Sequence, residues 1–238
     1  MELTVNISEY GYEKKVLFAN TSVSFYSGNL YLLKGENGCG KTTLFSLLSG
    51  QIVDENVTIF LNSKKLEKND YNSFYEDYVS YMTQDSLVFD NLSVKENLLL
   101  PFEKKDFEKA RKILEILELD SVENSLGKDL SLGEKQRLCF GRILYQPKKI
   151  VLLDECFSCL DERSARILKE NIQRLAKDRI VILISHIEVN FDSFILCSIK
   201  DGGIRIEGMP HQEESNTEKK VFKKHFSFFK TLSENRIL

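Results

Sequence analysis

A glycine-rich segment at residues 35–43 carries the residue types that bind phosphate groups. It reads Gly-Glu-Asn-Gly-Cys-Gly-Lys-Thr-Thr and matches the pattern G-x-x-x-x-G-K-S/T. Its glycines let the backbone bring N–H groups inward, and the helix that follows directs its positive N-terminal end to the same place. Lys41 supplies a point charge for phosphate oxygens, and the Thr42 hydroxyl is a suitable ligand for Mg²⁺. The pattern predicts a nucleoside triphosphate site formed by Gly35, Glu36, Asn37, Gly38, Cys39, Gly40, Lys41, Thr42 and Thr43.

Two carboxylates follow an apolar run later in the chain. Residues 150–153 read Ile-Val-Leu-Leu, and Asp154 and Glu155 come directly after them. Such a run is typical of a strand buried in a parallel sheet, where functional side chains gather at the carboxyl ends of the strands. We expect Asp154 to serve Mg²⁺ and Glu155 to act as the general base on a water that attacks the terminal phosphate. A second apolar run, 180–184, precedes His186, which we expect to bind the same phosphate or orient that water.

In their order along the chain, these motifs and three others resemble the ATP-binding cassette (ABC) family. The others are Gln84 in Tyr-Met-Thr-Gln-Asp, the segment Leu-Ser-Leu-Gly-Glu-Lys-Gln-Arg at 130–137, and the pair Leu160-Asp161. The resemblance covers about residues 1–208. It implies an α/β domain of the P-loop NTPase (RecA-like) class. A mostly parallel sheet, an antiparallel β patch and a helical insert at about residues 86–130 are expected.

The resemblance also implies a reaction, the hydrolysis of ATP to ADP and phosphate with Mg²⁺ as cofactor. Gln84 would join Thr42 and Asp154 at the metal ion, and it would act in catalysis beside Glu155 and His186. An aromatic residue before the P-loop strand stacks on adenine in this family. Its expected position here is Tyr10, with Tyr12 as the second choice; a tyrosine packed on a small sheet is the alternative.

The signature at residues 131–134 implies that a second cassette takes part. In the family this helix end binds the γ-phosphate of ATP held by the opposite subunit, so that ATP joins two cassettes, identical or different, head to tail. Glu134 in place of the common glutamine is usual in the exporter-like branch that resembles lipoprotein-releasing and macrolide-efflux ATPases. Leu132 replaces a glycine, and its side chain narrows the approach of the phosphate or excludes a positive φ. The residues expected to contact this second ATP are Ser131, Gly133 and Glu134, and Asp161 would couple the two sites.

Composition and one further segment bear on the partners. The chain has 238 residues, 42% of them hydrophobic, and no apolar run approaches the roughly 20 residues that cross a bilayer. No signal peptide is recognisable. Residues 87–98 are similar to the family segment that meets the membrane subunit, so we expect integral-membrane transporter subunits on separate chains. The protein would then lie on the cytoplasmic face of the membrane. Alternatives are a soluble ABC ATPase without a transporter, and a cassette that uses ATP as a switch with little hydrolysis.

Charge and cysteine content exclude other classes. The formal net charge is −3 with no long basic stripe, which argues against nucleic-acid binding. The five cysteines form an odd number, typical of a reduced, intracellular chain. Cys156 and Cys159 have the C-x-x-C spacing of metal and redox sites, but no second pair accompanies them, so we favour neither function.

The remaining pattern predicts the elements around these motifs. A helix over 106–119 would place Phe107, Ala110, Leu114 and Leu117 on one face, and another covers 161–177. Residues 62–77 are predicted to be a polar loop, and residues 201–203 a hairpin turn. The tail, 209–238, is predicted to be a polar linker and a basic amphipathic segment that contacts an anionic membrane or a partner, or packs on its own domain. Strands are expected at 3–7, 16–25, 30–33, 57–61, 78–82, 150–153, 180–184, 194–199 and 203–206.

Overall fold

The computed structural model describes residues 1–12, 15–85 and 87–208, and it is built around a six-stranded sheet. The spatial order is β10-β9-β3-β8-β7-β6, and every neighbouring pair is parallel except β9 and β10. Strands β7 and β8 are buried along their whole length, as expected for continuous apolar runs with both faces covered. The strands are β3 (Asn29–Lys34), β6 (Val79–Met82), β7 (Ile150–Asp154), β8 (Ile180–Ile184), β9 (Ile195–Lys200) and β10 (Gly203–Gly208).

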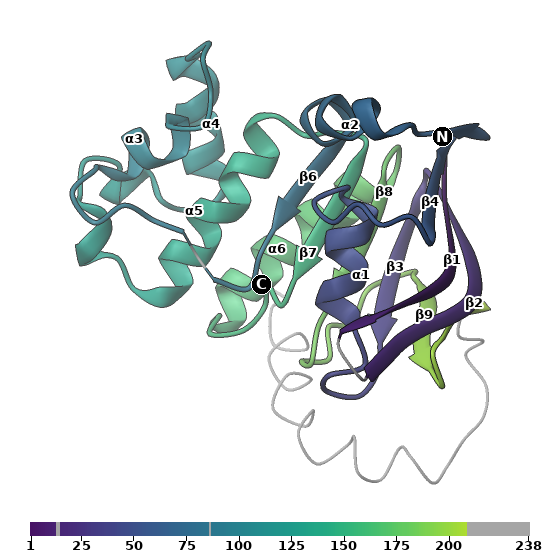
Figure 1. The fold of residues 1–238 in the computed structure, drawn as a ribbon. Coiled ribbons are helices and arrows are strands. Elements are labelled where there is room, and N and C mark those ends of the chain that lie inside the picture. The colour runs from purple at the N-terminus through teal and green to yellow at the C-terminus, as the bar shows by residue number, and fades with distance from the viewer. Residues whose placement is uncertain (13–14, 86, 209–238) are drawn as a thin grey trace, which may run out of the picture.

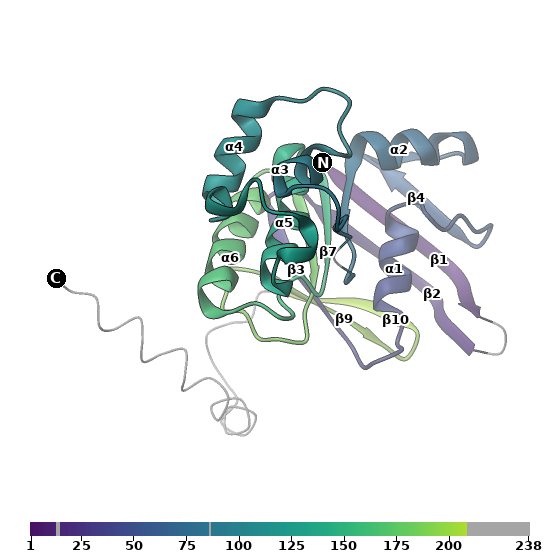
Figure 2. The ribbon, with the colours of Figure 1, turned by 90° about the vertical axis from the view of Figure 1, so that its left-hand side faces the viewer.

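A second, antiparallel sheet has the order β2-β1-β4-β5. Its strands are β1 (Glu2–Tyr12), β2 (Lys15–Tyr26), β4 (Val57–Leu61) and β5 (Lys64–Lys65). Helix α1 (Lys41–Leu48) lies between the two sheets, and its buried side chains share one core with both (Figures 1 and 2). The parallel sheet and the antiparallel patch predicted from the sequence are therefore confirmed.

Helices cover the other face of the large sheet and form a second core. Helix α5 (Leu132–Tyr145) and helix α6 (Glu162–Ala176) pack on the strands. Helix α3 (Val94–Leu99) and helix α4 (Phe107–Ile116) lie beyond α5, at the end of the molecule opposite the antiparallel sheet (Figure 1). None of the helices in the described ranges has the length and apolar character of a membrane span.

Two sequence predictions about these elements are wrong in part. The predicted polar loop at 62–77 contains β5, a 3-10 turn at Lys68–Asp70 and helix α2 (Tyr71–Tyr78). Only Tyr71 and Phe74 of this helix are buried. Two apolar positions one turn apart are too few to reveal a helical pattern in an otherwise polar segment. Phe107 is the first residue of α4 and is 57% exposed, with Lys95 Nζ 5.2 Å from the centre of its ring. The other three apolar residues of that predicted face are fully buried.

Other local predictions agree with the structure. The predicted helix over 161–177 is α6, whose residue Leu168 and its apolar neighbours are buried, and Asp161 is its N-cap. The predicted hairpin joins β9 to β10, with positive φ at Asp201 (51°) and Gly202 (74°) as a tight hairpin turn requires. The division into a cassette at 1–208 and a tail stays a prediction, and the tail lies outside the described residues.

Candidate functional site

The register of three parallel strands brings the sequence motifs together at one edge of the sheet. Leu33 of β3 and Asp154 of β7 are both paired with Ile184 of β8. The glycine-rich loop after β3, the two carboxylates at the end of β7 and His186 beyond β8 therefore start from the same level. This is the edge where parallel α/β sheets place their ligands.

The loop that precedes α1 has the backbone of an anion cradle. Gly38 and Gly40 have φ values of 74° and 105°, which non-glycine residues rarely adopt. A Cβ atom on Gly40 would lie 2.8 Å from Cζ of Phe18, so that only glycine fits. Gly40 is the N-cap of α1 and caps it with no side chain. The N–H groups of the first helical turn thus receive no side-chain cap from Gly40, and the helix dipole makes this end attractive to anions.

Lys41 lies inside this loop. Its side chain is buried, and its Nζ atom donates to the carbonyl oxygens of Gly35 at 2.9 Å and Glu36 at 3.1 Å. The ammonium group is therefore held at the centre of the loop and next to the helix N-terminus. Lys15 adds a second cation, because its Nζ atom donates to the Gly38 carbonyl oxygen at 2.8 Å.

A threonine and an aspartate join the start of α1 to the end of β7. Thr42 Oγ1 donates to Asp154 Oδ2 at 2.9 Å, and Asp154 is only 3% exposed. Burial raises the pKa of the Asp154 carboxyl above its usual value, and neighbouring Glu155 adds to the rise. The hydrogen bond from Thr42 and the charges of Lys41 and His186 lower it. A buried carboxylate beside a hydroxyl is a hard oxygen donor pair, so these two residues fit Mg²⁺.

Glu155 and His186 form a pair beside this aspartate. Glu155 Oε1 lies 3.1 Å from His186 Nε2, and the glutamate side chain is 22% exposed. The backbone of Glu155 is left-handed, with φ at 51°, and its N–H group donates to the Ile184 carbonyl oxygen at 2.9 Å. A non-glycine residue in this conformation is held there by its surroundings, as is common at functional sites.

These groups border one cavity of about 490 Å³. The sequence predicted most of its lining but missed Lys15, Leu17 and Ile184, for which no motif gives a signal. The described lining residues are Tyr12, Lys15, Leu17, Asn37, Gly38, Gly40, Lys41, Thr42, Thr43, Asp154, Glu155, Ile184 and His186.

Three predicted residues of the loop, Gly35, Glu36 and Cys39, do not line the cavity, and neither do Tyr10 and Gln84. Tyr10 does not line the cavity; it is half-buried against the core, and its ring is 5.7 Å from that of Tyr12, edge to face. A β-bulge separates the two tyrosines, because the pairing of β1 with β2 shifts between Tyr10 and Gly11. Gln84 is exposed in the bend after β6 and does not line the cavity. Its roles at the metal ion and in catalysis stay predictions.

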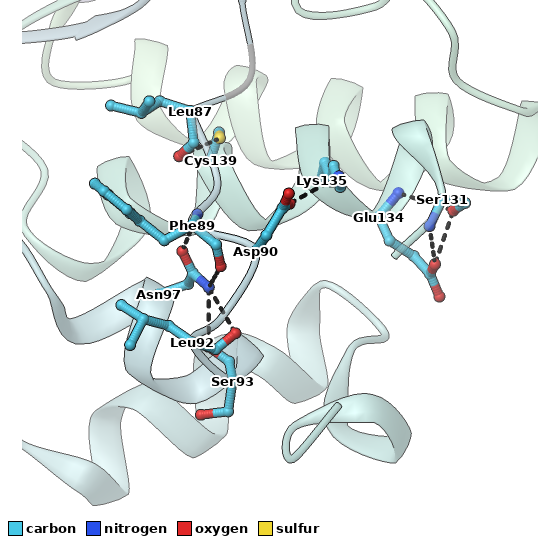
Figure 3. Close-up of polar contacts among 10 residues, drawn as sticks. All are labelled: Leu87, Phe89, Asp90, Leu92, Ser93, Asn97, Ser131, Glu134, Lys135 and Cys139. Carbon is cyan, nitrogen blue, oxygen red and sulfur yellow. Dashed lines mark hydrogen bonds and ion pairs between the residues drawn. The ribbon is translucent and has the colours of Figure 1, made fainter. Parts of the chain in front are cut away.

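The signature segment begins α5 and lies outside this cavity. Ser131 is the N-cap, and its N–H and Oγ–H groups both donate to Oε2 of Glu134, at 2.9 and 2.8 Å (Figure 3). Leu132 has no positive φ and is 63% exposed, so the expected backbone conflict is absent. Gly133 follows in the first turn and is half-buried.

A network of polar contacts fastens residues 87–93 to the helices. The fully buried Asn97 accepts from the Phe89 N–H at 2.8 Å and donates to the carbonyl oxygens of Phe89, Leu92 and Ser93 at 3.0 to 3.1 Å (Figure 3). Arg142 of α5 donates to the Leu87 carbonyl oxygen at 2.7 Å.

Next to this segment is a groove of about 340 Å³. Its lining includes three aromatic side chains, those of Tyr75, Tyr81 and Phe102, together with Arg142. The apolar side chain of Leu87, which also lines it, is 66% exposed.

Comparisons with known proteins agree with this geometry. The sequence model of the family described as "ABC transporter" matches residues 18–158. The ribose import ATP-binding protein RbsA of Caldanaerobacter subterraneus is 32% identical over 204 residues, which cover 78% of this chain and 41% of that protein. A putative export ATP-binding/permease protein of Rickettsia prowazekii is 29% identical over 84% of this chain and 36% of its own length. The cytochrome c biogenesis ATP-binding export protein CcmA of Reclinomonas americana is 29% identical over 74% and 81%.

The chain spans well under half the length of the first two of these relatives and most of the third. The family match covers more than half of the chain and includes the loop and both carboxylates of the cavity. The chain therefore belongs to the ABC transporter family.

Proposed function

We propose that this chain binds ATP with Mg²⁺ and hydrolyses ATP to ADP and phosphate as the nucleotide-binding subunit of an ABC transporter. The observation that carries the proposal is the single cavity in which the loop, Lys41, the Thr42–Asp154 pair and the Glu155–His186 pair meet. ATP fits these groups. Its phosphates need many backbone N–H donors and a cation, and its hydrolysis needs a general base at the same place.

Each residue has a defined task in the proposed reaction. The loop N–H groups and Lys41 bind phosphate oxygens, and Thr42 and Asp154 hold Mg²⁺. When bound, Mg²⁺ would neutralise phosphate charge. Glu155 accepts a proton from the attacking water while the water oxygen bonds to the γ-phosphorus, and the bond from that phosphorus to the bridging oxygen of ADP breaks. His186, 3.1 Å from Glu155, orients the water or contacts the γ-phosphate.

The adenine ring is assigned to Tyr12. The comparison of the two tyrosines supports this choice, because Tyr12 lines the cavity and is 52% exposed, whereas Tyr10 packs on the core. An exposed aromatic ring at the mouth of the cavity is available for stacking.

A second cassette completes the site. Ser131, Gly133 and Glu134 do not line the cavity of their own chain, yet they form a helix N-terminus that attracts anions. The arrangement supports two cassettes placed head to tail, with each signature facing ATP bound by the other. The Glu134 carboxylate already accepts from the Ser131 N–H group at this helix end. A phosphate that binds there would either move this carboxylate away or lie beside its negative charge.

We propose that the membrane subunit binds at the groove beside residues 87–93. The aromatic side chains of this groove and the exposed Leu87 offer an apolar surface to a helix of the membrane subunit, and the chain would lie on the cytoplasmic face of the membrane. Membranes from the native cells should bind the wild-type chain and the control variant Val53→Asp, whose parent residue is also exposed and apolar. Leu87→Asp should bind several-fold more weakly, and equal binding of all three would contradict this placement.

The binding step can be tested with two lysine variants. Lys41→Ala should lose ATP affinity by at least about tenfold, because it removes the buried ammonium group next to the loop carbonyls. Lys34→Ala is the matched control, since Lys34 is an exposed lysine at the end of β3, directly before the loop. Equilibrium titration with a fluorescent ATP analogue and competition by ATP give both affinities. Equal affinity of Lys41→Ala and wild type would refute the proposed site.

A further inference from the structure

Ser158 joins the proposed general base to the signature helix. It lies three residues after Glu155, and its N–H and Oγ–H groups both donate to the Glu155 carbonyl oxygen, at 3.1 and 2.9 Å. Its Oγ atom also accepts from Gln136 Nε2 of α5 at 2.9 Å. A hydroxyl has one hydrogen and two lone pairs, so it makes both Oγ contacts at once. Gln136 is 4% exposed, which places this connection inside the protein.

The hydrogen bonds from Gln136 through Ser158 end at Glu155, whose backbone conformation is strained. The left-handed backbone of Glu155 costs a non-glycine residue free energy and persists only where other contacts hold it. Its N–H group is fixed by Ile184, and its carbonyl oxygen receives both donors of Ser158. The direction in which the Glu155 side chain leaves the backbone, toward His186 and the cavity, depends on this conformation.

The next residue of α5 contacts the first turn of α6, the helix that follows residues 155–161. Arg137 Nη1 contacts the hydroxyl of Ser164, and the Ser164 N–H group donates to Asp161 Oδ1 at 2.7 Å. Two consecutive side chains of the signature helix thus contact Ser158, which is bonded to Glu155, and Ser164, which is bonded to Asp161. A movement of α5 would reach Ser158 and Ser164 together, because the Gln136 and Arg137 contacts are part-buried side-chain hydrogen bonds from adjacent residues of one helix.

We infer that Gln136 and Ser158 are positioning residues for Glu155, and that they couple phosphate binding at the signature of one chain to the general base of that same chain. The inference rests on the proposed function. When the signature of one cassette binds the ATP held by its partner, Glu155 of that same cassette would also be oriented for catalysis. The two sites of a pair would then hydrolyse ATP together.

Steady-state ATP turnover of Ser158→Ala, Gln136→Leu and the double variant tests the inference. Each single variant should lower kcat about tenfold and leave KM for ATP within twofold of wild type, because binding does not use these bonds. The double variant should fall no further than the single variants, since both interrupt one connection. Ser158→Thr keeps the hydroxyl and should retain kcat within about threefold.

Matched controls separate positioning from general destabilisation. Ser73→Ala removes a serine that donates to a backbone carbonyl at 3.0 Å in α2, far along the chain from the site. Gln173→Leu makes the same exchange on α6, at a half-buried position. Both should keep wild-type kcat and KM.

Amide hydrogen exchange gives a readout that does not depend on turnover. The Ser158 N–H group is bonded to the Glu155 carbonyl oxygen, so its protection should fall at least about tenfold in Gln136→Leu, while protection in β8 stays unchanged. Unchanged kcat in both single variants, additive losses in the double variant, or unchanged Ser158 protection would each overturn the inference. Absence of turnover in wild type would overturn the proposed function as well, whereas normal wild-type turnover with unaffected variants overturns the inference alone.

Discussion

Gly40→Ala tests whether the phosphate loop requires the backbone and the space seen in the structure. Gly40 has a φ of 105°. A Cβ atom added to it would lie 2.8 Å from Cζ of the Phe18 ring. The left-handed conformation costs an alanine about 1–2 kcal/mol, and the contact with a fully buried ring adds about 1–3 kcal/mol of overpacking. The free energy of unfolding should therefore fall by about 2–5 kcal/mol.

Gly208→Ala is the matched control for this variant. Gly208 also has a positive φ, at 85°, but a Cβ atom there has no neighbour within 4 Å among the residues that the structure describes. Its cost should be the backbone term alone, about 1–2 kcal/mol, and the difference between the two variants isolates the contact with Phe18. Phe18→Leu in the Gly40→Ala background should recover part of that difference, because it shortens the side chain that the methyl group meets.

Urea unfolding monitored by circular dichroism gives these free energies, and ATP titration of the folded variants gives the functional consequence. Gly40→Ala should weaken ATP binding at least about tenfold, since relief of the contact moves the N–H groups of the loop. Gly208→Ala should bind ATP normally. Equal losses of stability in the two variants, or ATP binding by Gly40→Ala as tight as in wild type, would show that the loop does not require glycine at residue 40.

Three further predictions concern single side chains. Asn97→Ala should lower the free energy of unfolding, measured by urea denaturation, by about 2–4 kcal/mol, because it removes a fully buried amide that accepts from one backbone N–H and shares its two hydrogens among three carbonyl oxygens. Exposed Asn72→Ala should cost under about 0.5 kcal/mol, and a similar loss in both would contradict this. Burial raises the pKa of Asp154 in the folded protein. The ionised carboxylate therefore lowers the free energy of unfolding at pH values above this folded-state pKa. It has no such effect at pH values below its pKa in the unfolded chain, about 4. Asp154→Asn should therefore raise the Tm of the nucleotide-free protein at pH 7 but not near pH 3, and a pH-independent gain would contradict that cause. Tyr12→Ala should weaken ATP binding several-fold and Tyr10→Ala should not; the reverse order would return the adenine contact to Tyr10.

Much of the site was predictable from the sequence because its parts are local or lie at strand ends. The loop at 35–43 and the acids after residues 150–153 need only a strand, a turn and a helix in succession, which their composition indicates. Parallel strands then bring their carboxyl ends to one edge, so the meeting of Thr42 with Asp154 follows from the fold class.

The remaining features depend on contacts that no local pattern records. A β-bulge between Tyr10 and Gly11 decides which tyrosine reaches the cavity, and alternation along a regular strand does not reveal it. Lys15 contacts the loop only because β2 passes beside it. Helix α2 buries just two aromatic side chains, so its periodicity is too short to distinguish it from a polar loop. The link from Gln136 to Ser158 joins residues 22 apart and has no sequence signature.

Glu155 is proposed here as the base for ATP hydrolysis at a site completed by a second cassette. Light scattering and phosphate release on wild type and Glu155→Gln, each with and without ATP and Mg²⁺, test both parts of this proposal. Glu155→Gln should bind ATP, lose turnover by at least about a hundredfold and accumulate as an ATP-dependent dimer. Wild-type turnover in Glu155→Gln, or a variant that binds ATP and stays monomeric at every concentration, would contradict it.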